Sequence, residues 1–133
     1  MTTLEDVKLT NFSVIKDIKG DIFVYQGLTF TRFFIVNSSI KQIRGAHAHK
    51  ECTQLLCAIE GSIRINLYDG YSTRTLLLKK NTDLVLIPPG IWADQEYERN
   101  SKLLVMCDLE FDELDYIRNW NDYLKFKSRD LEI

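Results

Sequence analysis

Short segments rich in β-branched and aromatic residues, separated by turn residues about every ten positions, dominate this chain. Such spacing is typical of all-β sandwiches and barrels. We expect strands at 12–16, 21–25, 31–37, 43–49, 53–59, 62–68, 73–78, 83–87 and 102–109. Parallel βαβ architecture needs helices between the strands, and no helical pattern separates these segments. The pattern therefore predicts an antiparallel sandwich or barrel.

The C-terminal region follows a different pattern. Its apolar residues recur at three- and four-residue steps, at Leu114, Ile117, Trp120 and Leu124. This spacing predicts an amphipathic helix over 112–127 that closes one face of the sheet. Asp112 is the expected N-cap, and Asp115 lies where a carboxylate is favoured near the positive end of a helix.

The composition fits a single domain over residues 1–133 and excludes several classes of protein. Hydrophobic residues make up 45% and charged residues 27%, a balance that argues against a disordered chain. No apolar run approaches the ~20 residues that cross a membrane, and residues 1–6 carry no secretion signal. The net charge of −2, without a basic block, argues against nucleic-acid binding.

Three cysteines, an odd number without Cys-x-x-Cys spacing, predict a cytoplasmic protein with reduced thiols. Cys57 and Cys107 lie among apolar residues, where a buried inert thiol is expected. Cys52 lies near His49, so a nucleophilic thiol is a minor alternative there.

The only two histidines, His47 and His49, are separated by one residue. On a strand, residues two apart share a face, so both imidazoles are expected to point the same way. A lone histidine on an apolar face is usually a core residue. Two on one face, with every other histidine absent, favour a functional pair.

Both histidines belong to a longer motif. The segment resembles the first cupin motif, because His47-x-His49 is followed after four residues by Gln54 and after six more by Gly61. The frame of the second cupin motif is matched by Pro88-Pro89-Gly90-Ile91-Trp92-Ala93. The resemblance implies a cupin double-stranded β-helix, a jelly-roll barrel with the C-terminal helix added. Metal cupins have a glutamate where this chain has Gln54 and a histidine where it has Ala93. Two imidazoles and a neutral amide hold a divalent ion poorly, so metal-free acid–base chemistry is expected, although Glu51 could substitute as a ligand.

A narrower resemblance covers nearly the full chain, from Asp17-x-x-Gly20 to the C-terminal region. It rests on residues 44–50 (Arg-Gly-Ala-His-Ala-His-Lys), Gln54, Gly61-Ser62-x-Arg64, Asp69-Gly70, Pro89-x-x-Trp92 and residues 112–118. With these motifs the chain resembles the nucleotide-sugar 3,4-ketoisomerases, which are WxcM-like cupins. Those enzymes act on dTDP-4-keto-6-deoxyglucose and move the ketone from C4 to C3. The resemblance implies the same activity here, without a metal or organic cofactor.

Within that resemblance, His47 is assigned as the proton shuttle between C3 and C4, and His49 as a relay at the sugar oxygens; the two roles could be exchanged. An imidazole pKa near ~6.5 suits such a shuttle at neutral pH. Arg44 and Gln54 are candidates for stabilising the developing oxyanion.

A dTDP-sugar also needs a diphosphate clamp and a platform for thymine. Arg32 and Arg64 are candidates for phosphate contacts. Trp92 and the Phe33-Phe34 pair are candidates for base stacking, although core packing is the more common role for any one of these aromatics.

Three positions depart from the family pattern. Ala93 stands where relatives carry His or Arg, and Lys19 stands where Arg or Tyr is usual; both positions are associated with the face on which C4 is protonated. The configuration at C4 of the product is therefore left open. Phe33-Phe34 lies where the family often has Tyr, which removes a phenolic proton relay.

The resemblance further implies a homodimer in which residues 1–16 are exchanged between protomers. Alternatives are a related nucleotide-sugar epimerase, a non-catalytic cupin that binds a sugar or nucleotide, and a metal-dependent cupin oxygenase.

Overall fold

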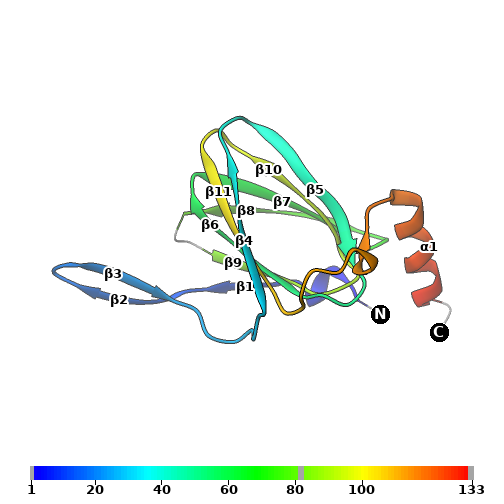
Figure 1. Cartoon of the computed structure of the whole chain (residues 1–133), viewed down its shortest axis with the longest axis horizontal. Coiled ribbons are helices and arrows are strands. Elements are labelled where there is room, and N and C mark those ends of the chain that lie inside the picture. Colours follow the sequence, from blue (N-terminus) through cyan, green and yellow to red (C-terminus); the bar gives the residue numbers. More distant parts are fainter. Residues whose placement is uncertain (1, 81–82, 132–133) are drawn as a thin grey trace.

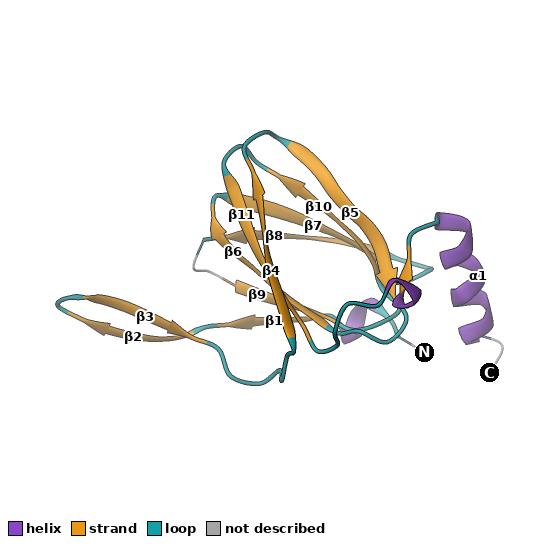
Figure 2. Ribbon diagram, viewed as in Figure 1, coloured by secondary structure: helices purple, strands orange, loops and turns teal. Residues whose placement is uncertain are grey.

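Two five-stranded antiparallel sheets face each other in the computed structural model, which describes residues 2–80 and 83–131 (Figures 1 and 2). The first sheet has the order β1 (Lys8–Asn11), β9 (Asp83–Ile87), β6 (Gln54–Glu60), β11 (Ser101–Cys107), β4 (Arg32–Ser38). The second has the order β12 (Tyr116–Ile117), β5 (Gln42–His49), β10 (Trp92–Tyr97), β7 (Ser62–Tyr68), β8 (Thr73–Lys79). The predicted antiparallel all-β architecture is confirmed.

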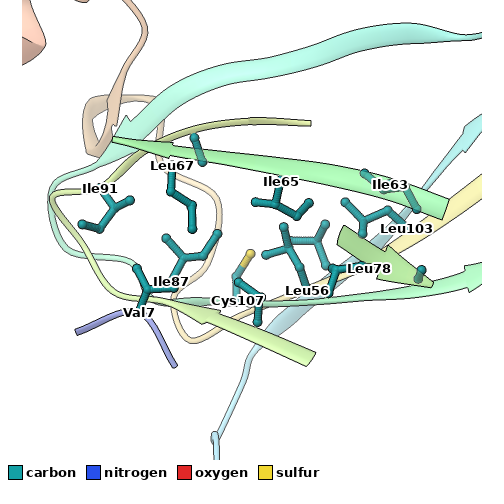
Figure 3. Close-up of a cluster of buried hydrophobic side chains, with 14 of the residues drawn as sticks. Val7, Leu56, Ile63, Ile65, Leu67, Leu78, Ile87, Ile91, Leu103 and Cys107 are labelled. Carbon is teal, nitrogen blue, oxygen red and sulfur yellow. The ribbon is translucent and has the colours of Figure 1, made fainter. Parts of the chain in front are cut away.

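The core fills the space between the two sheets, because the strands alternate apolar and polar residues. In β7, Ile63, Ile65 and Leu67 are at most 2% exposed and point inward (Figure 3). Leu56 of β6 and Ile87 of β9 belong to the same cluster, from the opposite sheet. Each buried aliphatic side chain contributes about 1.5–3 kcal/mol to stability.

The strand predictions differ from the structure chiefly where a strand is polar. β7 and β9 have the predicted bounds, and the other predicted strands are shifted by one or two residues at an end. Three strands, β1, β10 and β12, were not predicted. β10 contains Asp94, Gln95 and Glu96, and it forms because β5 and β7 pair with it on both sides, not because its residues favour strands.

The predicted helix over 112–127 is wrong in its first half. Asp112 caps a 3₁₀ turn (Glu113–Asp115) by accepting from the Leu114 amide at 3.0 Å, and β12 follows. Leu114, taken as part of the apolar stripe, is 80% exposed. The helix α1 is Trp120–Leu131, and Asn119 caps it through the Asp122 amide at 3.0 Å.

Two further segments complete the fold. Residues Leu4–Asp6 form a 3₁₀ turn before β1. The strands β2 (Ser13–Asp17) and β3 (Gly20–Val24) form a hairpin that projects away from the barrel (Figure 1). Within the described residues, α1 is too short and too polar to span a lipid bilayer.

Candidate active site

A cavity of about 250 Å³ opens into the barrel beside the edge strand β4 and the strand β5. Arg44, His47 and Gln54, three residues singled out in the sequence, line it. Arg118 also lines it, although the sequence analysis gave that residue no role. The remaining wall consists mainly of apolar and aromatic side chains from β4, β6, β10 and β11. Such a hollow, apolar with a few convergent polar groups, is the usual form of a small-molecule site.

The two histidines lie on the same side of β5, as predicted. Their ring centroids are 5.0 Å apart, with the planes at 85°. Ala48 points to the other side, where it is fully buried beside Ile117 and Tyr123. Gly45 precedes the pair at φ +78°, in a bulge where β5 and β10 shift register, and a Cβ at this position would collide with the Gln95 amide. The bulge therefore requires a glycine.

His49 is held by a carboxylate. Its Nδ1 lies 2.8 Å from Oδ2 of Asp115, and both side chains are at least 90% buried. Asp115 is itself fixed, because its Oδ1 accepts from the Glu51 amide at 2.6 Å and its carbonyl accepts from the Lys50 amide at 2.9 Å. In the neutral ring the carboxylate keeps the proton on Nδ1, so Nε2 is an acceptor. That Nε2 is buried, and it has no hydrogen-bond partner among the described residues.

Both imidazoles are biased toward the neutral form. Burial, followed by the neighbouring His49 and Arg118, lowers the pKa of His47 from 6.5 to about 4. Burial also lowers the pKa of His49, although Asp115 opposes this shift. At neutral pH His47 therefore faces the cavity as a free base.

Tyr116 connects the histidines to two arginines. Its ring centroid lies 5.0 Å from that of His47 and 4.3 Å from that of His49. Arg32 donates from Nη1 to the Tyr116 hydroxyl at 3.3 Å, while the Arg32 Nε is buried without a partner. The guanidinium of Arg118 lies 4.2 Å from the centre of the Tyr116 ring. These contacts bring two cations close to a pair of neutral bases.

Two cysteines lie behind this group. The Gln54 amide donates to the Cys107 sulfur at 3.4 Å. A hydrogen bond with the Cys52 thiol lowers the pKa of the Cys107 thiol against the effect of burial, and Gln54 and Arg32 shift it in the same direction. The same hydrogen bond and burial raise the pKa of Cys52. Cys107 is fully buried in the core, as predicted, and it also contacts the polar side chain of Gln54. Cys52 is held as a thiol, the less nucleophilic form.

Three other predicted substrate residues lie away from the cavity. Arg64 is on the outer face of β7, where it pairs with Glu96 at 3.4 Å. Trp92 is on the outer face of β10, packed against Trp120 at 5.1 Å between ring centroids. Lys19 is at the turn of the projecting β2–β3 hairpin. Arg64 and Lys19 were assigned to a strand and a turn correctly, whereas Trp92 lies on β10, which was not predicted.

The neighbouring residues Phe33 and Phe34 point to opposite faces of β4. Phe34 lines the cavity, whereas Phe33 faces solvent with 63% of its surface exposed.

The contacts of Asp115, Tyr116 and Arg118 with the histidines and the cavity were not predicted from the sequence. Asp115 was expected to favour the end of a helix, and that expectation is wrong, because the residue lies in a 3₁₀ turn and binds His49. A signal was present, since all three residues belong to the 112–118 stretch that carried the family resemblance.

The donor set suits hydrogen bonding better than metal binding. Among the described residues, His49, Cys52 and Asp115 form a group whose ligand atoms lie within 4.8 Å of one another. However, His49 and Asp115 are already bonded to each other, and Cys52 is held as a thiol, whereas a metal binds the thiolate. A metal here would have to break that pair.

Comparison with known proteins agrees with this geometry. A model of the FdtA family, described as WxcM-like, C-terminal, matches residues 5–128. A curated relative, the TDP-4-oxo-6-deoxy-alpha-D-glucose-3,4-oxoisomerase of Aneurinibacillus thermoaerophilus, is 26% identical over 126 residues, which cover 90% of this chain and 91% of the relative.

Two solved structures superpose closely on the chain. QdtA, a sugar 3,4-ketoisomerase from Thermoanaerobacterium thermosaccharolyticum in complex with TDP, has a TM-score of 0.89 at 26% identity, covering 96% of this chain and 98% of its own. A 3,4-ketoisomerase from Helicobacter canadensis has a TM-score of 0.87 at 28% identity, covering 92% and 98%. The predicted barrel with a C-terminal helix is therefore confirmed as the fold of these ketoisomerases.

Proposed function

Since the chain belongs to the FdtA family (WxcM-like, C-terminal), we propose that it is a nucleotide-sugar 3,4-ketoisomerase. The substrate is dTDP-4-keto-6-deoxy-D-glucose and the product a dTDP-3-keto-6-deoxyhexose, as the name of the curated relative suggests. The observation that carries the proposal is a neutral His47 that lines a cavity together with Arg44 and Gln54.

The reaction needs no external oxidant or reductant, because C3 is oxidised as C4 is reduced. His47 accepts the proton from C3, and the electron pair of that C–H bond forms the C3–C4 double bond of an enediolate. The hydroxyl proton moves from O3 to O4, and the His47 imidazolium returns its proton to C4. A positioned acid–base group of this kind typically raises the reaction rate by about 10²–10⁴-fold.

His49 is assigned to the oxygen proton. Its Nε2 is a buried acceptor without a partner, and its ring is 5.0 Å from that of His47. A neutral Nε2 can take the proton from O3 and give it to O4 while Asp115 stabilises the transient imidazolium. His49 does not line the cavity itself, so we assign it the relay and His47 the carbon protons.

Two cations and an amide are assigned to the negative charge of the substrate and of the intermediate. Arg44 and Arg118 line the cavity, and we assign them to the diphosphate. Gln54 also lines it, and we assign it to donate to the enediolate oxygen. Arg32 supports Tyr116 from behind the histidines. Opposite His47, Ala93 leaves room where relatives have a larger side chain, so we propose no C4 configuration for the product.

We further propose a homodimer. The projecting hairpin exposes Ile15, Ile18 and Ile22 at 57%, 100% and 56%, and the edge strand β4 exposes Phe33 and Ile35. Apolar side chains gathered in this way mark an interaction surface. In the single chain β1 pairs with β9 of its own barrel, so exchange of residues 1–16 remains a prediction that sedimentation and a dimer structure would test.

The three cysteines are free and buried. This supports the predicted cytoplasmic location, where thiols stay reduced.

To test this, the protein is incubated with dTDP-4-keto-6-deoxyglucose in D₂O, and the reaction is followed by proton NMR. In a parallel reaction, a 3-aminotransferase traps the 3-keto product. We expect a new 3-keto sugar with deuterium at C4, and deuterium at C3 in the 4-keto sugar that the reverse reaction re-forms. Binding without exchange or product would favour the non-catalytic cupin, and inversion at a ring carbon without ketone migration would favour the epimerase. Stoichiometric iron, manganese or zinc that turnover requires would overturn the metal-free mechanism.

A further inference from the structure

A hollow of about 460 Å³ on the outer face of the second sheet takes no part in the proposed reaction. It lies over β7, β8 and β10, beside the first residue of α1. The sheet separates it from the catalytic cavity, because Leu67 and Ala93 are buried on the inner face while their neighbours in sequence project outward. Whatever binds in this hollow therefore cannot reach His47.

One side of the hollow is aromatic. Tyr68 and Trp92 are partners across β7 and β10. Trp120, from α1, lies against both, at 4.9 Å from Tyr68 and 5.1 Å from Trp92 between ring centroids. Trp120 is still 41% exposed, so part of its ring is open to a ligand.

The other side is a row of polar side chains from the same three strands. Asp94, Asn66 and Thr75 are partners in register across β10, β7 and β8. The Asn66 amide donates to Oδ1 of Asp94 at 2.7 Å and accepts from the Thr75 hydroxyl at 3.0 Å. Within the described chain, Oδ2 of Asp94 has no hydrogen-bond partner. Because Asn66 holds its neighbours in place, this oxygen is an acceptor already oriented before a ligand arrives.

The two rows have the spacing and the chemistry of a sugar site. Residues two apart on a strand are roughly 7 Å apart, which is close to the width of one pyranose ring. A pyranose has an apolar face of C–H groups, which packs on aromatic rings, and a rim of hydroxyls, which bind carboxylate and hydroxyl groups. The charged side chains that line the hollow are Asp94 and Arg74, one of each sign, which favours an uncharged ligand over a nucleotide.

We propose that this outer hollow is a second, non-catalytic site that binds a neutral carbohydrate. The ring stacks on Trp120 beside Tyr68, and its hydroxyls bind Asp94 and Thr75.

The chain offers a specific reporter for this site. It contains two tryptophans, Trp92 and Trp120, and both line the hollow. We would titrate the protein with methyl α-D-glucopyranoside, methyl α-D-galactopyranoside and maltotriose, and follow tryptophan fluorescence and saturation-transfer NMR of the sugar protons. The expected result is a saturable change with at least one of these sugars, retained in the His47→Asn variant.

Matched variants distinguish stacking from general surface contact. Trp120→Ala is expected to weaken sugar binding by about tenfold, Trp120→Phe to retain most of it, and Asp94→Asn to weaken it without changing the fold. Ketoisomerase turnover by Trp120→Ala should stay within about twofold of wild type, since the site is on the other side of the sheet.

Three results would overturn the proposal: no saturable signal from any of the sugars with wild-type protein, equal binding by wild type and Asp94→Asn, or tighter binding of thymidine than of every sugar. Asp94→Asn retains a side chain of the same shape, so the test holds even if Trp120→Ala fails to fold.

Discussion

Replacing Asp115 with asparagine removes the carboxylate that holds His49 while keeping the side chain's shape. The pair is 2.8 Å apart with side chains 6% and 10% exposed, so solvent screens it little. A hydrogen bond to a charged group is worth about 1.5–3 kcal/mol. With an unfolding entropy of roughly 2.1 cal/mol/K per residue over 133 residues, a loss of about 2 kcal/mol lowers Tm by about 7 °C.

The same substitution changes the proton on His49. An asparagine amide can donate to Nδ1, which places the ring proton on Nε2 and removes the free acceptor. If His49 relays the hydroxyl proton, kcat should fall by about 10²-fold. KM should stay close to wild type, because Asp115 does not line the cavity.

Thermal unfolding followed by circular dichroism gives Tm, and the NMR assay gives kcat and KM. Glu113→Gln is the matched control. It lies two residues away in the same turn, but its ion pair with Arg118 is more than half exposed on both sides, so a Tm change within about 1 °C is expected. An Asp115→Asn variant that unfolds and turns over like wild type would refute the assignment of Asp115 and of the His49 relay together.

Further predictions concern His47, two arginines and the helix. His47→Asn should abolish turnover with dTDP affinity little changed in calorimetry; near wild-type rates would remove it from the shuttle role. Because the pKa of His47 is lowered to about 4, the unfolded chain binds more protons between pH 4 and 6.5. Stability should therefore fall as pH falls through that window, by up to about 3 kcal/mol, and less so in His47→Asn, as urea titrations at pH 4.5 and 7 would show. Arg44→Ala should raise KM by about tenfold and Arg64→Ala by less than about twofold; equal effects would contradict their placement. Tyr123→Phe removes the one hydroxyl donor that lies within hydrogen-bond distance of both the Tyr68 and Gly90 carbonyls, and should cost about 1–3 kcal/mol of unfolding free energy. An unchanged urea midpoint would show that the hydroxyl does not hold α1.

The site was predicted best where the two-residue repeat of a strand decides which side chains face the cavity. His47 and His49 share a face because strand side chains repeat every two residues, and that period survives the bulge at Gly45. β7 was placed correctly for the same reason, since its alternation marks one buried face.

Prediction failed where tertiary contacts decide the structure. The run Leu114, Ile117, Trp120 has helical spacing, yet Ile117 pairs with Ala48 in a strand and Leu114 faces solvent. Likewise, Trp92 lies on β10, which borders the cavity, and Arg64 lies on the neighbouring β7, but alternation turns both side chains outward. Strand assignment alone cannot give the face when the neighbouring strand was itself missed, as β10 was.

The different environments of the two histidines follow from the partners of β5. His47 lies opposite Ala93 of β10, whose small side chain leaves the cavity open. His49 lies opposite Tyr116 of β12, and the turn just before that strand supplies Asp115. One ring is thus left facing the cavity as a free base, and the other is covered and oriented by a carboxylate. Since the same short segment supplies both the carboxylate and the covering ring, residues 112–118 build the active site rather than merely close the barrel.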